Sequence, residues 1–451
     1  MPISQTGARM DTEAYEYLNE WREVSLTSVA DIRFSSVNKV SQPGEEPVRL
    51  CNYTDVYNND YVTADMDFMR ATATKSEIER FGLQVGDVII TKDSETPDDI
   101  GIPTVVDTTA PDLVCGYHLA LLRPNQDEVD PTFLAKQLAH HRIARYFGQQ
   151  ANGTTRYGLS TAAIANAPLH LPRPENQRSA SALMRMVDAQ IAQTKAVIAK
   201  LTQVRAGMLH DLLSYGLDEH GQLRDPIAHP EQFQDSPLGL IPVEWDVFRI
   251  DDVSEKVQDG THFSPKSTSG PRRYLTSKNI RFGYLDLAEC GWISENEHRE
   301  IFRRCDVRKG DVLLTKDGAN TGNAAINTLD DDFSLLSSVA FVRGKDGRLV
   351  SEYLLNYLLS PVAQKRIKDL MSGNAITRLT LQKIKDFTIP VPGYEEQRVI
   401  AAHLEKCTAK ISAYAAELEG HKNIKSGIQE DLLTGQVRVP ETIIMEGAEN
   451  A

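Results

Sequence analysis

Few side chains in this sequence have the spacing that catalytic chemistry requires. The glycine-rich stretch Gly318–Asn323 lacks the Lys-Ser/Thr pair with which a Walker loop grips phosphates and magnesium. His140 and His141 are adjacent, so on one helix their rings would point about 100° apart and make poor joint metal ligands, and a surface or packing role is favoured. Asp330–Asp332 is a run that attracts cations, but a solvated turn is its commoner role.

Two further enzyme classes are disfavoured by motifs that the sequence lacks. There is no Pro-Pro-Tyr motif of an amino-methyltransferase, and Asn58–Tyr61 resembles one only faintly. Glu-x-Lys, the usual carboxylate-lysine end of a nuclease site, occurs nowhere. The sequence therefore predicts a chain that binds and positions its partners, with no catalytic residue and no metal site of its own.

The elements that must position the remaining polar residues come from an internal repeat, whose copies lie about 220 residues apart. Glu20-Trp21 returns as Glu244-Trp245, and Val85–Asp93 returns as Lys309–Asp317. Further matching pairs are Thr155-Arg156 with Thr377-Arg378, Gln177-Arg178 with Gln397-Arg398, and Asp211–Leu213 with Asp431–Leu433. Two similar units in tandem can present two related binding surfaces to one elongated target.

Length and composition agree with two globular units. A chain of 451 residues is too long for one core. Its five cysteines are scattered without a CxxC pair, which argues against a disulfide framework and a structural zinc site. The first 20 residues are polar and acidic, unlike a signal peptide, and no apolar run is long enough for a membrane helix. We therefore expect a cytoplasmic protein.

The net charge of −14 taken alone points away from nucleic acid, because nucleic-acid binding depends on neutralising phosphates. The second copy nevertheless carries basic clusters. These are Arg272, Arg273, Lys278 and Arg281, and Arg303, Arg304, Arg308 and Lys309. If the chain binds DNA, partner subunits are expected to supply much of the positive surface.

Each copy is expected to be an α+β unit followed by a long helix. Residues 85–91 and 113–122 have the β-branched and apolar content of strands, and residues 130–147 and 351–370 fit helices. The runs Leu169–Pro172 and Phe387–Pro392 close the units, because proline favours extended backbone before a helix begins.

The long helices carry apolar residues at alternating steps of four and three, the a/d rhythm of a coiled coil. One such helix would most often cap its own domain, but two matched helices favour packing on each other as an antiparallel pair with pseudo-twofold symmetry. Polar seam members Thr194, Arg205, His421 and Lys425 either set the register or face solvent. The apolar seam is Met184, Val187, Ile191, Ile198, Leu201, Met208, Leu212, Ile400, Leu404, Cys407, Ile411, Tyr414, Leu418, Ile428 and Leu432.

These motifs, in this order and given twice, resemble the specificity (S) subunits of type I restriction-modification systems. The most specific are Gly310–Thr315, Thr377–Leu379, Ile389–Pro392 with Glu396–Arg398, and Asp431–Gly435. The resemblance covers nearly the whole chain.

The first copy departs more from the family pattern, at Thr155–Leu159 and Leu171–Pro174. The resemblance implies two target-recognition domains that read the two halves of a split DNA sequence, while the helical pair sets the gap. It implies this division of the chain: target-recognition domain 1 at 1–174, a central helix and linker at 175–235, target-recognition domain 2 at 236–394, a C-terminal helix at 395–437 and a flexible tail at 438–451.

The resemblance also implies partners: double-stranded DNA, two DNA-adenine methyltransferase subunits and restriction/translocase subunits. The chain itself would hold no cofactor, with S-adenosylmethionine and ATP bound by those partner subunits.

DNA contact is expected from polar residues in segments predicted to be loops. Lys92 and Lys316 follow a strand in each copy, and the amides near Lys316 suit adenine edges. An ordinary surface charge or turn contact is the alternative for each candidate. The full set is Lys92, Arg156, Arg272, Arg273, Lys316, Asn320, Thr321, Asn323 and Arg378.

Two other functions stay open from the sequence. A duplicated enzyme requires a catalytic site that the motifs do not reveal, and turnover by the isolated chain would identify it. A protein-binding assembly scaffold without DNA readout fits the acidic net charge, and absence of DNA affinity with and without partners would support it.

Overall fold

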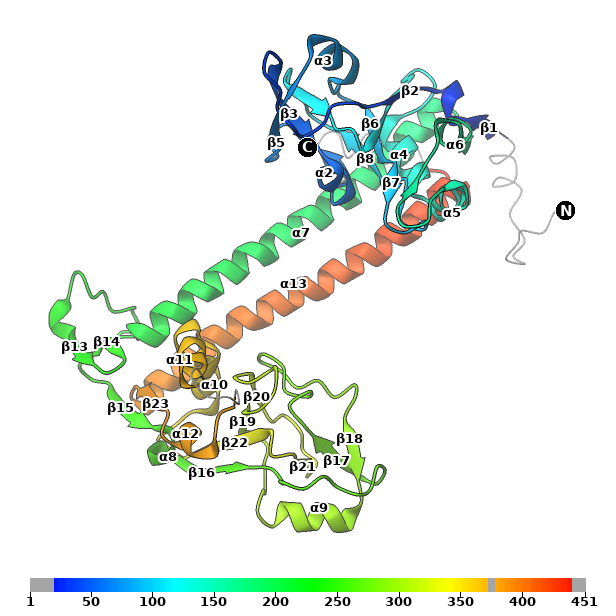
Figure 1. Ribbon diagram of the computed structural model, residues 1–451. Helices are drawn as coiled ribbons and strands as arrows, with labels where there is room; N and C mark the ends of the chain where they lie inside the picture. Colours follow the sequence, from blue (N-terminus) through cyan, green and yellow to red (C-terminus); the bar gives the residue numbers. More distant parts are fainter. Residues whose placement is uncertain (1–19, 372–377, 440–451) are drawn as a thin grey trace. The chain divides into compact units, whose positions relative to one another are not determined.

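The computed structural model describes residues 20–371 and 378–439 and divides into two compact units (Figure 1). Unit 1 combines residues 1–195 with residues 417–451, and unit 2 comprises residues 196–416. The long helices α7 (Pro174–Ser214) and α13 (Tyr394–Thr434) therefore each contribute to both units. The predicted flexible tail from residue 440 onward, the first 19 residues and the predicted loop residues 372–377 lie outside the described residues.

Unit 1 is built on a five-stranded sheet in the order β2-β10-β6-β8-β4. Its strands are β2 (Ala30–Phe34), β10 (Leu119–Pro124), β6 (Val88–Thr91), β8 (Pro103–Val106) and β4 (Tyr61–Val62). A second sheet, β5-β3-β9, contains Met69–Ala73, Glu46–Cys51 and Leu113–Cys115. Short pairs join β1 (Arg22–Ser25) to β12 (Pro168–Leu171) and β7 (Asp93–Ser94) to β11 (Tyr157–Gly158). The helices are η1 (Leu26–Ser28), α2 (Tyr53–Tyr57), α3 (Lys75–Phe81), α4 (Pro131–Ala139), α5 (His141–Gln150) and α6 (Thr161–Ala165).

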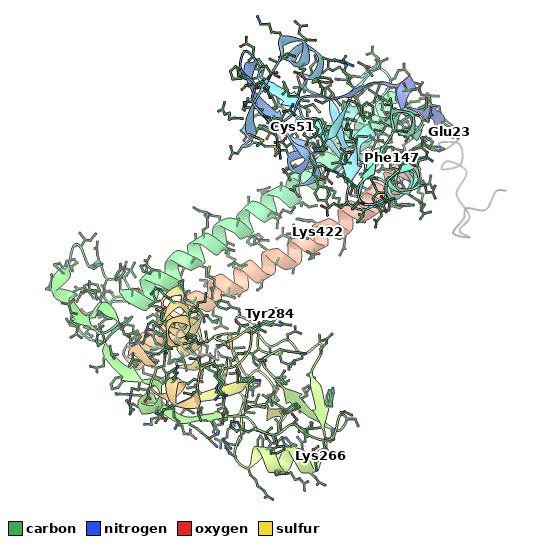
Figure 2. The ribbon with its side chains drawn as sticks, viewed as in Figure 1. Glu23, Cys51, Phe147, Lys266, Tyr284 and Lys422 are labelled. Atoms are coloured by element: carbon green, nitrogen blue, oxygen red, sulfur yellow. The ribbon has the colours of Figure 1, made fainter. Side chains whose placement is uncertain are left out.

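The central sheet of unit 1 is buried on both faces, which explains the continuous apolar run of β6. Successive strand residues point to opposite faces. Val88 and Ile90 accordingly join one core with α4, α5 and the long helices, whereas Ile89 joins the second core against the smaller sheet. Phe147 lies in the first of these cores and Cys51 in the second (Figure 2).

Unit 2 repeats this plan on a four-stranded sheet, β16-β22-β19-β20, formed by Ser254–Asp259, Val339–Gly344, Val312–Thr315 and Ala324–Ile326. A three-stranded sheet, β18-β17-β21, contains Gly291–Ile293, Arg272–Leu275 and Ser334–Leu335. The pairs β13 (Phe233–Ser236) with β14 (Gly239–Pro242) and β15 (Asp246–Arg249) with β23 (Thr388–Val391) complete the strands. The helices are η2 (Pro230–Gln232), α8 (Ile250–Val253), α9 (Glu295–Phe302), α10 (Ser351–Leu359), α11 (Pro361–Met371) and α12 (Leu381–Lys385).

The repeated Gly-Asp motif has the same structural role in both units. Asp87 accepts two hydrogen bonds of 2.8 Å from the guanidinium of Arg123 on β10. Asp311 accepts bonds of 2.9 and 2.8 Å from Arg343 on β22. The glycine before each aspartate has a φ near +90° (88° and 89°), a conformation that side chains rarely adopt. The motif thus ties the start of a central strand to its neighbour.

The α+β class and the two-unit organisation are confirmed, and the two long helices each contain 41 residues and begin 220 positions apart. The single helices expected at 130–147 and 351–370 are wrong, because each is broken into two. His140 and Ser360 lie at the breaks in extended backbone, with ψ of 141° and 149°. The strand expected at 113–122 is likewise split by a turn into β9 and β10.

Among the described residues, no helix combines the length and the apolar character needed to cross a membrane.

Candidate functional site

Each long helix is fixed at its start by a buried glutamine of the repeated Gln-Arg motif. The Gln177 side-chain oxygen accepts a 3.0 Å bond from the Asp130 amide, while its nitrogen donates to the carbonyls of Glu128 and Pro172. This set of bonds joins the first turn of α7 to the turn that precedes α4. Gln397 makes the same three bonds in unit 2, with Val350, Arg348 and Pro392.

The seam positions of α7 and α13 face inward. Every residue of the predicted apolar seam is buried or half-buried. In unit 1, Met184 packs in one core with Leu432 and Ile428, and in unit 2, Leu212 packs in one core with Leu404. The early part of α7 thus meets the late part of α13 and the reverse, so the paired segments run in opposite directions (Figure 1).

A charged cluster in unit 1 includes Lys425, one of the predicted polar seam residues. Its ammonium lies 2.6 Å from Asp60 and 2.7 Å from Asp188 on α7. Lys136 on α4 pairs with the same two carboxylates at 3.1 and 2.7 Å. The Tyr61 hydroxyl donates a 2.8 Å hydrogen bond to Asp188. We call these five residues the unit 1 charge cluster.

The pKa shifts in the unit 1 charge cluster follow from its balance of charges. Burial alone raises the pKa of Asp60, but the two lysines outweigh this effect and hold it below its usual value. Burial lowers the pKa of Lys425, whereas its hydrogen bonds and attraction to Asp188 and Asp60 raise it overall. Both groups are therefore stabilised in their charged forms. Lys425 was recognisable from the heptad rhythm, but Asp60 and Lys136 carry no sequence signal that connects them to it.

The polar seam residue of unit 2 is bonded differently. Arg205 donates hydrogen bonds to Thr408 on α13 at 2.8 Å and to Asn356 on α10 at 3.3 Å. The guanidinium thus joins both long helices to the α+β part of unit 2 without a buried carboxylate partner.

In unit 1, Lys92 directly precedes strand β7, and Arg156 directly precedes its partner strand β11. Each lies next to one strand of the short β7–β11 pair, and the Leu159 amide donates a 2.9 Å bond to the Lys92 carbonyl. The Lys92 ammonium lies 5.5 Å from the centre of the Phe34 ring, and Arg156 is exposed. Arg156 is therefore the more accessible of the two cations.

In unit 2 the corresponding lysine is buried, and Arg378 takes the pairing position that Gly158 has in unit 1. Asp317 and Arg378 form an isolated β-bridge, so the exposed Arg378 lies opposite the residue that follows Lys316. The Lys316 side chain is only 8 % exposed, and its ammonium lies 3.3 Å from buried Asp259. Contact of this ammonium with DNA would require the ion pair to break.

The unit 2 loop that contains Asn320, Thr321 and Asn323, which we call the amide loop, is stabilised by hydrogen bonds from these side chains to backbone carbonyls. Asn320 donates to the Ser277 carbonyl, Thr321 to that of Gly318, and Asn323 to that of Ile280, at 3.5, 2.7 and 3.2 Å. The amide oxygens of Asn320 and Asn323 make no hydrogen bond within the described residues and are the groups left for an external donor.

Arg272 and Arg273 lie on strand β17, so the loop predicted for them is wrong. Arg272 forms a 2.7 Å ion pair with Glu295. Arg273 pairs with Asp331 at 3.2 Å and lies 5.2 Å from the centre of the Trp292 ring. Their charges are partly neutralised by these carboxylates.

An open cleft of 620 Å³ beside the amide loop was not predicted from the sequence. Exposed Lys278 lies at its edge, and the buried Tyr274 hydroxyl has no hydrogen-bond partner within the described residues. The cleft is lined by Tyr274, Thr276, Ser277, Lys278, Asn279, Glu289, Gly291, Asp317, Gly318, Leu336, Ser337 and Ser338. It adds a concave surface of mixed polar and apolar character next to the loop that carries Asn320, Thr321 and Asn323.

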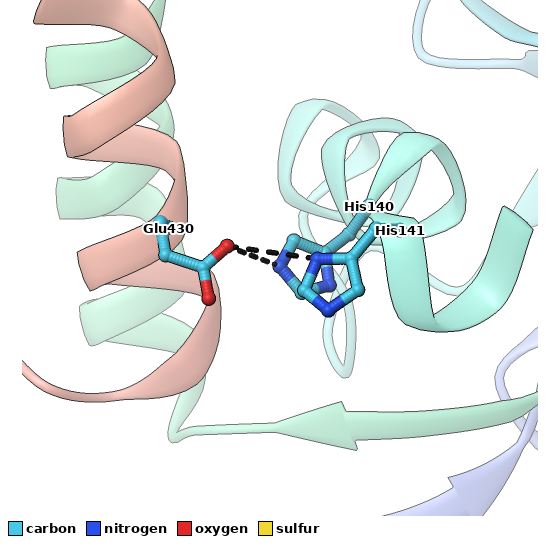
Figure 3. Close-up of side chains that lie close together, drawn as sticks. All are labelled: His140, His141 and Glu430. Atoms are coloured by element: carbon cyan, nitrogen blue, oxygen red, sulfur yellow. Dashed lines mark hydrogen bonds and ion pairs between the residues drawn. The ribbon is translucent and has the colours of Figure 1, made fainter. Parts of the chain in front are cut away.

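The prediction that His140 and His141 point apart is wrong. Their ring centres lie 4.2 Å apart, and both rings face Glu430 on α13 (Figure 3). The reason is that His140 is not helical, so the 100° helical rotation per residue does not apply to this pair.

Comparison with known proteins shows which proteins this chain resembles. Residues 242–419 match the family described as type I restriction modification DNA specificity domain. The MjaX type I restriction enzyme specificity subunit of Methanocaldococcus jannaschii is 24% identical over 81% of this chain and 81% of its own length. The MjaVIII specificity subunit of the same organism is 22% identical over 65% of this chain and 68% of its own length.

The fold agrees with this relationship. A type I restriction-modification S subunit from M. genitalium superposes with a TM-score of 0.56 at 14% sequence identity, covering 91% of this chain and 96% of that structure. Residues 242–419 thus match a type I restriction modification DNA specificity domain, and the chain is similar along most of its sequence to specificity subunits of type I restriction enzymes and shares the fold of such an S subunit.

Proposed function

We propose that this chain gives a type I restriction-modification complex its DNA sequence specificity, with each unit reading one half of a bipartite target. The observation that supports this proposal best is the duplicated framework. In both units, the aspartate of the Gly-Asp motif accepts hydrogen bonds from an arginine on the neighbouring strand. In both, a buried glutamine forms the same hydrogen bonds at the start of a 41-residue helix. Two similar but non-identical units suit two different half-sites.

The long helices are the proposed spacer. At 1.5 Å per residue, a helix of 41 residues is about 60 Å long. One turn of DNA is about 34 Å, so helices of this length suit half-sites on successive turns. The inward-facing seam would keep the spacing constant, because sliding one helix along the other would unpack it.

The proposed contacts with DNA combine exposed cations with shaped loops. Arg156 and Arg378 are both exposed and lie at or beside the short strand pairing that follows Lys92 in unit 1 and Lys316 in unit 2, and Lys278 lies at the edge of the unit 2 cleft. Such cations position the duplex through its phosphates, and the oxygens of Asn320 and Asn323 are available to accept from base edges.

The acidic net charge of −14 means that this chain supplies only part of a DNA-binding surface. We infer that two DNA-adenine methyltransferase subunits dock on it and complete that surface, and that restriction/translocase subunits join the assembly. In this arrangement S-adenosylmethionine and ATP belong to the partners, the chain performs no chemistry, and the complex works in the cytoplasm.

The test is co-expression of the chain with the methyltransferase encoded beside it, followed by mapping of methylated adenines with and without the chain. A motif of two short defined halves around a fixed gap, seen only with the chain, is expected. Exchange of unit 1 for that of another specificity subunit should change one half of the motif and leave the other half unchanged. Methylation that does not depend on the chain would reject DNA readout in favour of a protein-binding scaffold.

A further inference from the structure

Three potential metal ligands meet at the corner between α4 and α5 in unit 1. His140 Nε2 lies 3.1 Å from Glu430 Oε2, and His141 Nδ1 lies 3.6 Å from the same oxygen. One donor atom from each of the three residues lies within 4.8 Å of the other two (Figure 3). The histidines come from the corner, and the glutamate comes from the last turns of α13.

The backbone at this corner determines that both rings face the glutamate. His140 has a φ of −66° and a ψ of 141°, so it ends α4 in extended conformation before α5 begins at His141. The change of direction between the two residues turns both imidazoles toward α13.

The distances and donor types suit a transition-metal ion. Zinc binds imidazole nitrogens and carboxylate oxygens at about 2.0–2.2 Å in a tetrahedral arrangement, which places neighbouring ligand atoms about 3.3 Å apart. The two measured separations from Glu430 Oε2, 3.1 and 3.6 Å, lie on either side of that value. Two histidines with one carboxylate leave one position for water, as in open zinc sites.

The internal repeat shows that the fold does not require these ligands. Because the corresponding helices of the two units begin 220 residues apart, His140, His141 and Glu430 correspond to Ser360, Pro361 and His210. The unit 2 residues provide one imidazole and no carboxylate. The set of three metal ligands is therefore present in unit 1 and absent at the corresponding positions of unit 2.

The repeat also shows that the unit 1 corner lacks favourable helix-start residues. Ser360 caps α11 with a 3.2 Å hydrogen bond from the Ala363 amide, and Pro361 occupies the first helical position, where proline is favoured. His140 makes no side-chain cap at α5. Histidines at these positions do not serve the local helix geometry, which favours a role in binding.

Access to the site is compatible with uptake of an ion. The His140 side chain is 7 % exposed, whereas His141 and Glu430 are 56 % and 45 % exposed. His140 therefore lies at the buried side of the site, and the side chains of His141 and Glu430 border solvent.

We propose that His140, His141 and Glu430 bind one divalent transition-metal ion, with zinc as the ion whose preferences they fit, and that this ion fastens the end of α13 to the α4–α5 corner of unit 1. This site is separate from the proposed DNA contacts. The ion adds a metal-dependent link to the core packing and ion pairs that already hold the C-terminal helix in unit 1.

The test is titration of the metal-free full chain with Zn²⁺ against a chromophoric chelator. The wild type is expected to bind one ion per chain at this site, and His141→Ala and Glu430→Gln are each expected to weaken binding at least tenfold. His210→Ala, at the unit 2 position equivalent to Glu430, is the matched control and should bind like the wild type.

Two further readouts separate metal binding from folding. Metal-free His141→Ala should melt at the wild-type temperature, because its side chain is exposed, and only the wild type should gain in melting temperature with Zn²⁺. Co²⁺ should give the visible absorption of a four-coordinate site in the wild type and not in His141→Ala. A wild type without stoichiometric binding, or a His141→Ala variant that binds equally well, would overturn the proposal and leave only polar contacts between the histidines and Glu430.

Discussion

Asp188 on α7 and Lys425 on α13 form a 2.7 Å ion pair that is 7 % and 25 % exposed. The pair joins the two long helices within unit 1, and Lys136 and Asp60 complete a cluster of two positive and two negative charges. A buried pair of this kind fixes one register, because any shift would leave a charge unpaired in a poorly solvated place.

Replacement of Lys425 by alanine is expected to destabilise unit 1 by about 2 kcal/mol, because Asp188 loses one of its two cations while Lys136 stays in place. Urea unfolding measures the loss. Lys422→Ala is the matched control, since Lys422 pairs with Glu419 on the helix surface and should change stability by less than about 0.5 kcal/mol. Equal effects of the two variants would contradict a structural role for the cluster.

The same cluster predicts a dependence of stability on pH. The folded-state pKa of Asp60 is lowered, so its contribution is fully present above the unfolded pKa of about 3.9 and is lost as pH falls through the folded value. The pKa of Lys425 is raised, so its contribution is fully present below about 10.4 and is lost at higher pH. The difference in melting temperature between the wild type and Asp60→Asn should be constant from about pH 6 to 9 and shrink below about pH 4. A difference that grows on acidification would contradict the sign of the Asp60 shift.

The aspartates of the two Gly-Asp motifs, Asp87 and Asp311, can be compared by making the same substitution in each unit. Asp87→Asn should cost about 3 kcal/mol, because Arg123 loses the carboxylate that accepts two of its bonds. Asp311→Asn should cost less, since Arg343 keeps Asp306 at 3.4 Å. Chemical denaturation that reports on each unit separately, for example through Trp21 in unit 1 and Trp245 in unit 2, measures both. A larger loss for Asp311→Asn would show that Asp306 does not compensate.

DNA affinity of the assembled complex should depend on the two exposed arginines. Arg156→Ala and Arg378→Ala should each weaken binding to all sequences and reduce the slope of log affinity against log salt by about 1, the behaviour of a phosphate contact. Lys316→Ala should instead lower stability, because buried Asp259 loses a partner. Arg398→Ala is the surface control, and a salt slope unchanged in both Arg156→Ala and Arg378→Ala would remove these residues from the DNA surface.

Whole heptads inserted into both α7 and α13 should lengthen the gap in the methylated motif. Seven residues add about 10 Å, or about 3 base pairs, while the half-sites stay the same. A heptad inserted into one helix alone should abolish specific methylation, because the seam then loses its register. An unchanged gap after the double insertion would contradict the spacer role.

The repeat, the α+β class and the extent of the long helices could be predicted from the sequence, because an apolar rhythm sustained over some 40 residues and recurring in register is specific. The break at Ser360 has a signal in the sequence, because a serine followed by proline is typical of the start of a new helix. The break at His140 has no such signal, since a helix-compatible composition does not reveal that one residue is extended. DNA contact was predicted for Lys316 because a lysine after a strand is commonly exposed, whereas the partner that buries it, Asp259, is distant in sequence.

Unit 1 is discontinuous and unit 2 is continuous, which affects the order in which a newly made chain can fold. All of unit 2 has been synthesised once residue 416 is added, but the core of unit 1 still lacks Leu432, Leu433 and Val439 at that moment. On the ribosome, the unit that comes second in the sequence can therefore be completed first. A premature stop shortly after residue 416 would leave the N-terminal half of the protein unfinished while leaving the other half whole.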